Sequence, residues 1–379
     1  MVAASNSINK DVDYVCDGTD DQVEINAAIT ALGAIGGTVM LLEGTYNITA
    51  SINLASNVTL MGQGAGTVLR IPNGHNNNLD VISASSVNRV LVANLRIDGN
   101  RANQAAGIMR GIYFETVTYS EIARCRVENL RFDGIRLATS SNNNTVAGNN
   151  CQSNGNSGIR LATSSNNTIT GNNCQSNNNE GIVLDASSNN NTITGNNIQS
   201  NDYEGILLSI SSNNTVAGNN CQGNEAGIVL DGSNNNTITG NNCQSNITCG
   251  IYLTNSSNNT VTGNTCQGNG TNGIYIYDSA YNNTVTGNTV VGNSQTTDNT
   301  YDGIFIDADS DYNNVQGNTV RHAGGAKQHR YGIRIDNANC DGNLVIDNDL
   351  YLAGRTLDYS NAGTSTIYHN NRITVGWVP

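Results

Sequence analysis

One short stretch of sequence is repeated six times between Asn144 and Gly287. Each copy contains an Asn-Thr-Val/Ile-x-Gly-Asn segment, a Cys-Gln or Ile-Gln pair, and a Gly-Ile-x-Leu/Ile segment. The glycines that open the last segment are spaced by 22 to 24 residues: Gly134, Gly158, Gly181, Gly205, Gly227, Gly250 and Gly273. A fixed period of this length predicts a solenoid, in which each repeat buries its apolar face only against its neighbours.

The pattern inside one repeat indicates which kind of solenoid is formed. Three short runs carry apolar residues at every second position, which is typical of β-strands. Asn- and Gly-rich turns separate the runs, and both residues tolerate the left-handed conformation of sharp corners. The repeat therefore predicts an all-β, single-stranded parallel β-helix of about 23 residues per coil. We expect the right-handed form, since parallel crossovers are almost always right-handed.

Alignment of the repeats identifies three columns of inward-facing residues. The first column is Val127, Cys151, Cys174, Ile198, Cys221, Cys243, Cys266, Val290, Val320 and Leu350. The second is Val146, Ile169, Ile193, Val216, Ile238, Val261, Val285, Val315 and Val345. The third follows the opening glycine: Ile135, Ile159, Ile182, Ile206, Ile228, Ile251, Ile274, Ile304 and Ile333. Equivalent residues should stack about 4.8 Å apart, one strand spacing.

Five of the 9 cysteines fall in the first column. Ile198 and Val290 occupy the same slot, so it accepts a medium-sized apolar group, and free cysteine behaves as a small buried hydrophobe. In-register neighbours also keep their Cβ atoms farther apart than the ~3.8 Å of a disulfide. We therefore expect these thiols to be reduced and buried. The sequence suggests no pairing for the other four: Cys16, Cys125, Cys249 and Cys340.

The net charge of −13 argues against nucleic acid and anionic membrane surfaces as partners. No apolar run approaches the roughly 20 residues of a membrane span, so membrane insertion is not expected. The segment from Met1 to Asn6 lacks the basic and apolar regions of a signal peptide. We expect an extracellular, cell-surface or virion location, reached either after removal of a signal or by another route such as virion release.

An Asn-x-Ser/Thr sequence recurs at the same corner of successive repeats, beginning at Asn143, Asn166, Asn190, Asn213, Asn235, Asn258 and Asn282. It is a glycosylation acceptor only in an exported protein that meets the machinery. Because the position recurs so regularly, we favour an asparagine ladder, in which stacked side-chain amides are hydrogen-bonded along the corner.

Residues 21–32 are expected to form the one substantial helix. Asp21 and Glu24 have the spacing of a capping box, and Gly33 should end the helix. Its apolar face comprises Val23, Ile25, Ala27, Ala28, Ile29 and Leu32. We expect this helix to cover the open end of the first coil, as terminal caps do in solenoids.

These features divide the chain into five segments. They are residues 1–35 (N-terminal segment and capping helix), 36–135 (irregular coils), 136–290 (regular repeats), 291–350 (last coils with two loop insertions) and 351–379 (closing segment, with Ile373 to Trp377 at its end).

Several N-terminal motifs are similar to those of a known family. Asp17-Gly18-Thr19-Asp20-Asp21 before the helix, Gly37-Thr38-Val39, Glu43-Gly44-Thr45-Tyr46 and Leu60-Met61-Gly62-Gln63-Gly64 resemble the N-terminal module of the pectate-lyase-like β-helix superfamily. Leu95 to Arg101 resembles the coil that follows it. The module occurs in polysaccharide lyases, alginate C5-epimerases and phage tailspikes. The resemblance covers residues 11–135 and implies a right-handed β-helix, a polysaccharide partner, and a monomer or homo-oligomer, a trimer if tailspike-like.

The function is not decided by this resemblance, because the fold is found in lyases, hydrolases, epimerases and inert fibres. The epimerases carry a Tyr-Gly-Phe-Asp-Pro-His signature after the module. The matching stretch here is Asp133 to Ala138, with Arg136 in the carboxylate slot and Ala138 in the imidazole slot. The epimerase catalytic motif is therefore not retained.

Two loop insertions interrupt the period in the last coils, at Ser294–Tyr301 and His322–Tyr331. Both precede a Gly-Ile-x-Ile strand, so we expect them to lie side by side. The candidate substrate-binding residues should lie on the strand face next to them and in the insertions themselves: Tyr252, Tyr275, Tyr277 and Phe305 on the strands, and Tyr301 and Arg330 in the insertions. Aromatic rings suit the faces of sugar rings, and neighbouring polar groups suit sugar hydroxyls.

The candidate catalytic residues are Asp307, Asp336, Arg334, His329 and Lys327. Asp307 and Asp336 are expected on neighbouring coils with carboxyls roughly 5 Å apart, the separation of a retaining glycosidase pair. Repulsion between such close carboxylates would raise the pKa of one of them. Lys327, His329 or Arg330 would instead supply the base of a lyase or an epimerase.

Asp307, Asp309 and Asp311 have the opening alternation of a calcium-binding loop. The loop lacks the glycine at its sixth position, and Asn318 stands where the distal glutamate should be. Calcium is thus one expectation for this loop, and no other cofactor is expected.

Two functional hypotheses remain open. In the first, the chain is an extracellular or virion-associated protein that binds a polysaccharide and processes it as a lyase, an epimerase or a glycoside hydrolase, if it is an enzyme. In the second, it is a non-catalytic structural solenoid, such as a spike, a spacer or a component of a surface layer or fibre. The paired insertions favour the first hypothesis and the near-identical middle repeats favour the second.

Overall fold

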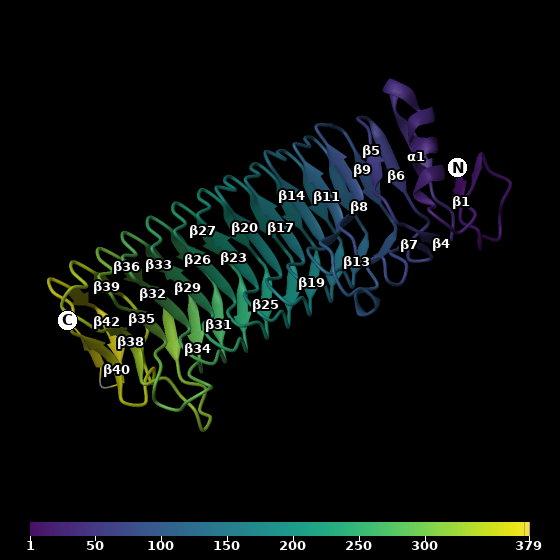
Figure 1. Ribbon diagram of the computed structural model, residues 1–379. Helices are drawn as coiled ribbons and strands as arrows, with labels where there is room; N and C mark the ends of the chain where they lie inside the picture. Colours follow the sequence, from purple (N-terminus) through teal and green to yellow (C-terminus); the bar gives the residue numbers. More distant parts are fainter. Residues whose placement is uncertain (375, 379) are drawn as a thin grey trace. The chain divides into compact units, whose positions relative to one another are not determined.

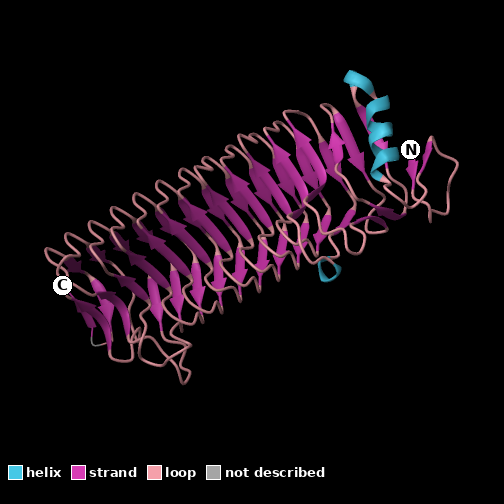
Figure 2. Cartoon of the chain, in the orientation of Figure 1, coloured by secondary structure: helices cyan, strands magenta, loops and turns pink. Residues whose placement is uncertain are grey.

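The computed structural model describes residues 1–374 and 376–378. The chain forms two compact units, residues 1–192 and 193–379. Strands and turns make up nearly all of each unit (Figure 2), and α1 (Gln22–Ala31) is the only α-helix among the described residues. Neither it nor the short 3-10 helices at Gly33–Ile35 and Arg101–Asn103 could span a membrane. Val375 and Pro379, in the expected closing segment, lie outside the described residues.

The first unit consists of six coils, each of which gives one strand to each of three parallel sheets (Figure 1). The first sheet contains β3 (Gly37–Met40), β6 (Val58–Met61), β9 (Leu91–Ala93), β12 (Glu121–Ala123), β15 (Thr145–Ala147) and β18 (Thr168–Thr170). The second contains β4 (Gly44–Asn47), β7 (Thr67–Arg70), β10 (Arg96–Asp98), β13 (Arg126–Glu128), β16 (Asn150–Gln152) and β19 (Asn173–Gln175). The third contains β5 (Ile52–Leu54), β8 (Leu79–Ser85), β11 (Met109–Glu115), β14 (Ile135–Ala138), β17 (Ile159–Ala162) and β20 (Ile182–Asp185). β1 (Val2–Ala3) and β2 (Tyr14–Val15) form a separate parallel pair.

The second unit repeats this plan over about seven coils. Its first sheet contains β24 (Thr215–Ala217), β27 (Thr237–Thr239), β30 (Thr260–Thr262), β33 (Thr284–Thr286), β36 (Asn314–Gln316), β39 (Leu344–Ile346) and β41 (Ile367–His369). Its second contains β22 (Asn197–Gln199), β25 (Asn220–Gln222), β28 (Asn242–Gln244), β31 (Thr265–Gln267), β34 (Thr289–Val291) and β37 (Thr319–Arg321). Its third contains β23 (Ile206–Ser209), β26 (Ile228–Asp231), β29 (Ile251–Thr254), β32 (Ile274–Tyr277), β35 (Ile304–Ile306), β38 (Tyr331–Ile335) and β40 (Leu357–Asn361). β21 (Thr192–Thr194) begins at the last residue of the first unit, and β42 (Asn371–Ile373) pairs antiparallel with β43 (Gly376–Val378).

The three expected inward columns form the core. Every member of the first two columns is fully buried, and in the third only Ile333 has measurable exposure, at 1%. The column cysteines are buried and unbridged, as predicted. Contact between neighbouring thiols and burial both raise the pKa of Cys221 and of Cys266, so these groups stay protonated.

The opening glycines are required by the close approach of successive coils. A Cβ atom at Gly250 would lie 2.6 Å from the carbonyl oxygen of Gly273 and 2.9 Å from the Cβ of Cys266. Both distances are below van der Waals contact, so a side chain at this position has no space. The period that marks the sequence therefore records a packing constraint between coils.

Asparagine ladders run along the corners, but the sequon asparagines are not part of them. At one corner of the second unit, Asn236 N–H donates to Asn259 Oδ1 (2.8 Å), and Asn259 repeats the contact with Asn283 (2.9 Å). The expected member Asn235 is exposed and has φ of 58°, as a left-handed corner residue. The prediction of a ladder is confirmed, but its placement on the sequon residue is wrong, because that residue supplies the turn and the next one points inward.

The helix α1 covers the N-terminal end of the first unit, as expected (Figure 1). The Asn26 amide accepts from Asn53 N–H (2.8 Å) and donates to Ser51 O (3.0 Å), so it satisfies the free edge of β5. The expected capping box is absent, because the Asp21 carboxylate accepts from the N–H groups of Gly18 and Asn47 instead. The predicted apolar face was too wide, since Val23 and Ala27 are exposed.

Candidate functional site

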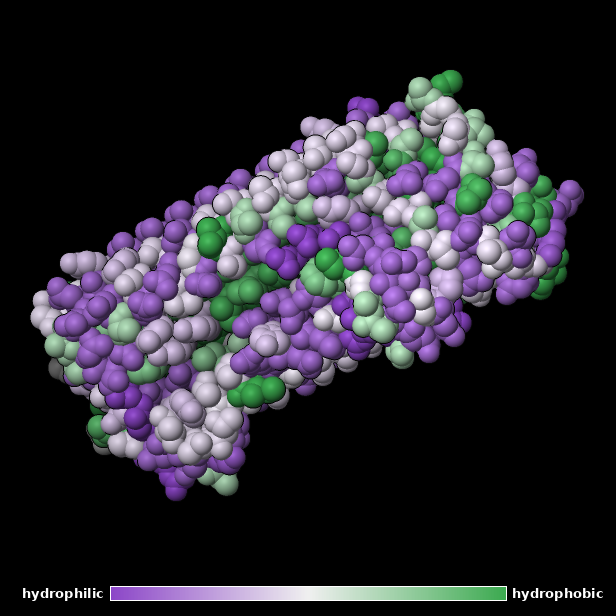
Figure 3. Space-filling view, viewed as in Figure 1, coloured by the Kyte–Doolittle hydropathy of each residue, from purple (hydrophilic) through white to green (hydrophobic). Residues whose placement is uncertain are grey.

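The two loop insertions lie side by side in the second unit and are bonded to one another. Lys327 Nζ donates to Gln295 O (2.6 Å) and to Thr296 O (3.1 Å). Asn299 N–H donates to Gln328 O at 3.1 Å. The insertions form a largely polar lobe that projects beside the strands (Figure 3). Exposed Lys327, expected as a catalytic base, therefore has its ammonium group engaged in holding the two loops together.

An aromatic stack crosses the outward face of the third sheet in this unit. The Tyr275 ring lies between those of Tyr252 and Phe305, with centroid distances of 5.1 and 5.0 Å and interplanar angles of 20° and 13°. The Arg334 guanidinium covers the next face of Phe305 at 5.2 Å. We expected these rings to present their faces to a sugar. The strand register instead places the rings one strand apart and parallel, so the neighbouring rings cover both faces of Tyr275. Its ring edge and its hydroxyl remain available.

Tyr277 has a different orientation from this stack. Its ring is tilted by 44° to that of Tyr275, with 5.3 Å between centroids. It is half-buried, as are Tyr252 and Tyr275. Burial raises the pKa of Tyr252 and of Tyr275, so both phenols remain hydrogen-bond donors across the neutral range.

A buried carboxylate organises the arginines at the C-terminal end of the face. Asp302 Oδ2 accepts from Arg330 Nη2 (2.8 Å), and Oδ1 accepts from Arg330 Nε (3.2 Å). Arg334 Nη1 lies 3.7 Å from the same carboxylate. Burial raises the pKa of Asp302, while the hydrogen bond and charge of Arg330 act against that rise. This bidentate pair fixes Arg330, a candidate binding residue, at the base of the second insertion.

Asp307 and Asp336 follow adjacent strands in register but are not arranged as a bare carboxylate pair. Asp307 Oδ1 accepts from Asn337 Nδ2 and from the N–H of Ala308, both at 2.8 Å. Asp336 forms an ion pair with Arg334. Each carboxylate thus has partners of its own, and the retaining-glycosidase arrangement expected from the sequence gains no support from these contacts.

His329, expected as a catalytic base, is fully buried. Its Nε2 accepts from Asn293 N–H (2.7 Å), and its Nδ1 lies 3.2 Å from Ala353 O. Burial lowers the pKa of His329 to about 4. Both ring nitrogens are occupied inside the coil, so we exclude this residue from the site. Tyr301 lies beside Asp302, half-buried at the end of the first insertion.

The calcium expectation gains no support from the side-chain positions. Only one group of three possible ligands gathers within 4.8 Å among the described residues, and it is Cys16, Asp21 and Glu24. Asp307 has the partners given above, and Asp311 Oδ1 accepts from Asp341 N–H at 2.7 Å. The Asp307 and Asp311 carboxylates are therefore bonded to residues of the next coil.

The sequence analysis missed Asp302, Asn337 and Tyr331, whose ring lies 5.1 Å from the Arg330 guanidinium. One signal was present: Asp302 precedes an opening glycine, as the buried Asp133 does in the first unit. In both coils the aspartate in that slot is paired with arginine, Asp133 with Arg136 and Asp302 with Arg330.

Two family profiles match the sequence. Residues 183–298 match the family described as "Right handed beta helix region", and residues 47–224 match "Periplasmic copper-binding protein (NosD)". A search of curated protein sequences gives no match.

Several solved structures share this fold, and the matches extend over most of this chain. The A-module of the Azotobacter vinelandii mannuronan C-5 epimerase AlgE4 is 21% identical with a TM-score of 0.68, and the match covers 97% of each chain. Pre-mature gene product 12 of bacteriophage phi29 is 14% identical with a TM-score of 0.71, over 95% of this chain and 55% of that one. PfbA, a surface adhesin of Streptococcus pneumoniae, is 16% identical with a TM-score of 0.64, over 88% and 90%. With its 23-residue repeat and three parallel sheets, the chain has the fold of a right-handed parallel β-helix.

Proposed function

We propose that the chain binds a polysaccharide on the outward face of β29, β32, β35 and β38, next to the paired insertions. The observation that carries this proposal is the juxtaposition of three half-buried tyrosines with Asp307 and Asp336 on one rigid sheet face. Binding residues concentrate where loops stand on such a scaffold.

The stacked rings define how a sugar chain would be held. Because the faces of Tyr275 are covered, contact falls to ring edges, to the tilted ring of Tyr277 and to the tyrosine hydroxyls. Asp307 and Asp336 supply acceptors for sugar hydroxyls. The ring stack and the ion pair of Arg334 hold these groups in place before a ligand arrives, which lowers the entropy lost on binding.

The comparisons support the proposal at the level of the fold. The AlgE4 module is named as a mannuronan epimerase, and PfbA as a surface adhesin. Epimerase chemistry is not included, because Arg136 and Ala138 replace the carboxylate and imidazole of the epimerase signature. The other candidate acids and bases are each engaged by neighbouring groups, which favours binding over catalysis.

Copper, named in the description of one matching family, does not fit the residues present. Copper sites are built from imidazole, thiolate and thioether groups. The one group of three or more His, Cys, Asp or Glu side chains that gathers in the described chain has a single thiol, Cys16, with two carboxylates and no histidine. The contacting thiols of the column are stacked inside the core. We therefore assign no role to copper.

We further propose an extracytoplasmic or virion location. The matching family is described as periplasmic, and the similar structures include a surface adhesin and a bacteriophage product.

The alternative function, a non-catalytic structural solenoid, rests on one observation. The stack of Tyr252, Tyr275 and Phe305 also stabilises the sheet by itself, since such pairs contribute roughly 0.5–1.5 kcal/mol each. In that case the outward aromatics would need no ligand.

Affinity electrophoresis of the full chain in gels containing neutral or acidic polysaccharides tests the proposal. The double variant Asp307→Asn with Asp336→Asn should lose retardation while keeping its melting temperature within a few degrees, because both groups are partly exposed. Asp231→Asn is the matched control, since Asp231 occupies the same outward slot on β26, outside the proposed footprint.

Retardation by no polysaccharide, with no depolymerisation or unsaturated product formed, would favour the structural alternative. Undiminished binding in the double variant would place the ligand on another face.

A further inference from the structure

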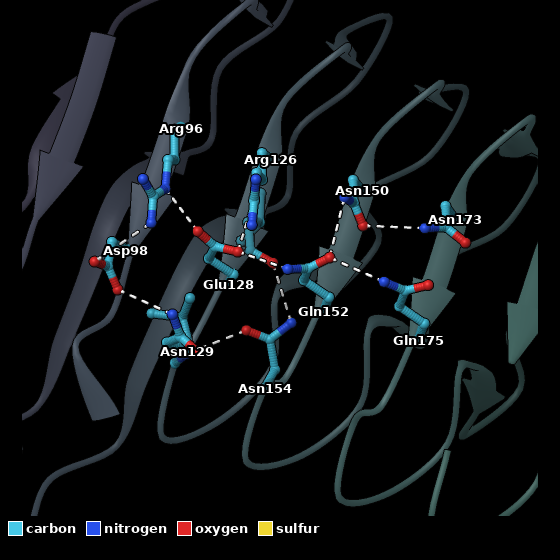
Figure 4. A network of polar contacts seen from close by, with 12 residues as sticks. Arg96, Asp98, Arg126, Glu128, Asn129, Asn150, Gln152, Asn154, Asn173 and Gln175 are labelled. Atoms are coloured by element: carbon cyan, nitrogen blue, oxygen red, sulfur yellow. Dashed lines mark hydrogen bonds and ion pairs between the residues drawn. The ribbon is translucent and has the colours of Figure 1, made fainter. Parts of the chain in front are cut away.

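A second polar surface lies on the outward face of the second sheet of the first unit. It is formed by three arginines of adjacent strands, Arg70 of β7, Arg96 of β10 and Arg126 of β13 (Figure 4 shows the last two). Arg96 is directly opposite Arg126 in the strand register. Neighbouring strands lie about 4.8 Å apart, so these two guanidinium groups belong to one small area.

The acidic groups of this area, Asp98 and Glu128, are less exposed than the arginines. The Asp98 side chain is 17% exposed, and its Oδ2 lies 4.0 Å from Arg70 Nε. Glu128 is 2% exposed, whereas the side chains of Arg96 and Arg126 are 32% and 44% exposed. Glu128 Oε1 accepts from Arg96 Nε (2.6 Å) and Oε2 accepts from Arg126 Nε (2.7 Å). Gln152 Nε2 donates to the same Oε2 at 2.8 Å. The Glu128 carboxylate is bonded within the protein, and the most exposed charged groups of this area are the guanidinium groups.

The hydrogen bonds also leave one edge of each guanidinium free. Both arginines bind Glu128 through Nε, so the two terminal nitrogens of Arg126 have no hydrogen-bond partner in the described chain. For Arg96, terminal Nη2 lies 3.8 Å from Asp98 Oδ2, which is an ion pair without a hydrogen bond. Two parallel N–H groups of this kind match the two oxygens of a carboxylate or sulfate.

The same register positions continue as amides along the sheet. Asn150 follows Arg126, and Asn173 follows Asn150. Asn173 Nδ2 donates to Asn150 Oδ1 (3.3 Å), and Gln175 Nε2 donates to Gln152 Oε1 (3.1 Å) (Figure 4). These uncharged groups offer hydrogen bonds to hydroxyls and contain no aromatic ring for stacking a nucleobase.

We propose that this surface, the arginine track (Arg70, Arg96, Arg126 and the amides of Asn150, Gln152, Asn173 and Gln175), binds a linear glycan through its carboxylate or sulfate groups. The guanidinium edges take the anionic groups, and the amides take the hydroxyls of the following sugars. The net charge of −13 disfavours a densely charged polymer such as DNA and leaves a local attraction for sparse anionic groups. The track is in the first unit and does not depend on the site proposed in the second.

Binding of the full chain to two pairs of probes tests this inference. Dextran sulfate of low sulfate content is compared with dextran, and polygalacturonate with its methyl ester, so each pair differs only in its anionic groups. The two pairs distinguish sulfate from carboxylate. We expect binding to at least one anionic probe that weakens with added salt, and no binding to either neutral probe.

The double variant Arg96→Lys with Arg126→Lys isolates the guanidinium edges. Each lysine keeps its charge and a contact with Glu128, so the buried carboxylate remains paired and the melting temperature should be retained. The planar fork is lost, and affinity for the anionic probe should fall roughly tenfold or more. Arg89→Gln is the control, an exposed arginine of the same unit outside the track, and should leave affinity within about twofold.

Three results would overturn the inference: equal binding of the neutral probes, unchanged affinity in the double lysine variant, or binding of double-stranded DNA that the variant abolishes equally. The Asp307→Asn with Asp336→Asn variant should bind the anionic probe as the unmodified chain does. A failed test of the site in the second unit would therefore not affect the test of the arginine track. A failed test of the arginine track would likewise not affect that of the site in the second unit.

Discussion

His329 replaces an asparagine at the end of a ladder, and we expect this position to make the stability of the protein sensitive to acid. Along this corner the N–H of Asn246 donates to Asn269 Oδ1 (3.0 Å), and that of Asn269 to Asn293 Oδ1 (2.9 Å). The next N–H, that of Asn293, donates to His329 Nε2 at 2.7 Å. Protonation of this nitrogen would place a donor against a donor in a fully buried site.

The size of the effect follows from the two pKa values. The unfolded chain binds a proton at His329 near pH 6.5, and the folded chain only near pH 4, because burial lowers the pKa and the charge of His322 adds to this. Between these values the unfolded state binds more protons, so the free energy of unfolding falls as the pH is lowered. From pH 7 to pH 5 the loss at this one site is about 2 kcal/mol, approaching about 3 kcal/mol near pH 4.

Urea titrations followed by circular dichroism at pH 7 and pH 5 measure this loss. His329→Gln keeps an acceptor for Asn293 N–H and cannot be protonated, so it should lose about 2 kcal/mol less than the unmodified chain. Hydrogen exchange at the Asn293 amide should show the same difference locally. His322→Gln is the control and should keep most of the acid sensitivity. An equal pH dependence in the unmodified chain and His329→Gln would refute the reasoning.

Three further substitutions test the packing. Cys221→Val should change the free energy of unfolding by less than about 1.5 kcal/mol and Cys221→Asp by several kcal/mol, because the slot is fully buried; rapid labelling of the native ladder thiols would contradict this. Asn246→Ala removes the acceptor of Asn224 N–H and the donor to Cys221 O, so the free energy of unfolding from urea titrations should fall by about 2–5 kcal/mol. Asn235→Gly, on the exposed left-handed corner, should lower it by less than about 1 kcal/mol. Gly250→Ala should lower the melting temperature through its clash with Gly273 O, while Gly325→Ala, with open space around it, should not; equal melting temperatures would contradict the packing argument.

The core could be predicted from the sequence because inside and outside alternate locally along each strand. A residue such as Ile159 needs only its neighbours in the repeat to be assigned inward, and a one-residue slip would expose the whole column. The opening glycines and the reduced column thiols followed in the same way, since each coil repeats the constraints of the one before it.

The candidate site was predicted only as a location. Period breaks at the same corner correctly placed the two insertions side by side, because adjacent coils bring equivalent corners together. Which side chains would be available there was not predictable. Nothing in the sequence distinguishes His329 as an inward-facing ladder residue. Asp302 is set apart from the other acids by its bonds to Arg330, which only the structure shows.

The repeat itself determined the fold class, the core columns and the presence of ladders, because these follow from a period that acts within and between identical coils. Only the tertiary structure decided that Asn236 and not Asn235 enters a ladder, that the rings beside Tyr275 cover one another, and that Glu128 lies beneath its two arginines. The physical reason is common to the three cases. Each depends on the direction of a side chain relative to the next coil, about 4.8 Å away, and that direction is set by backbone torsion and contact between coils rather than by residue type.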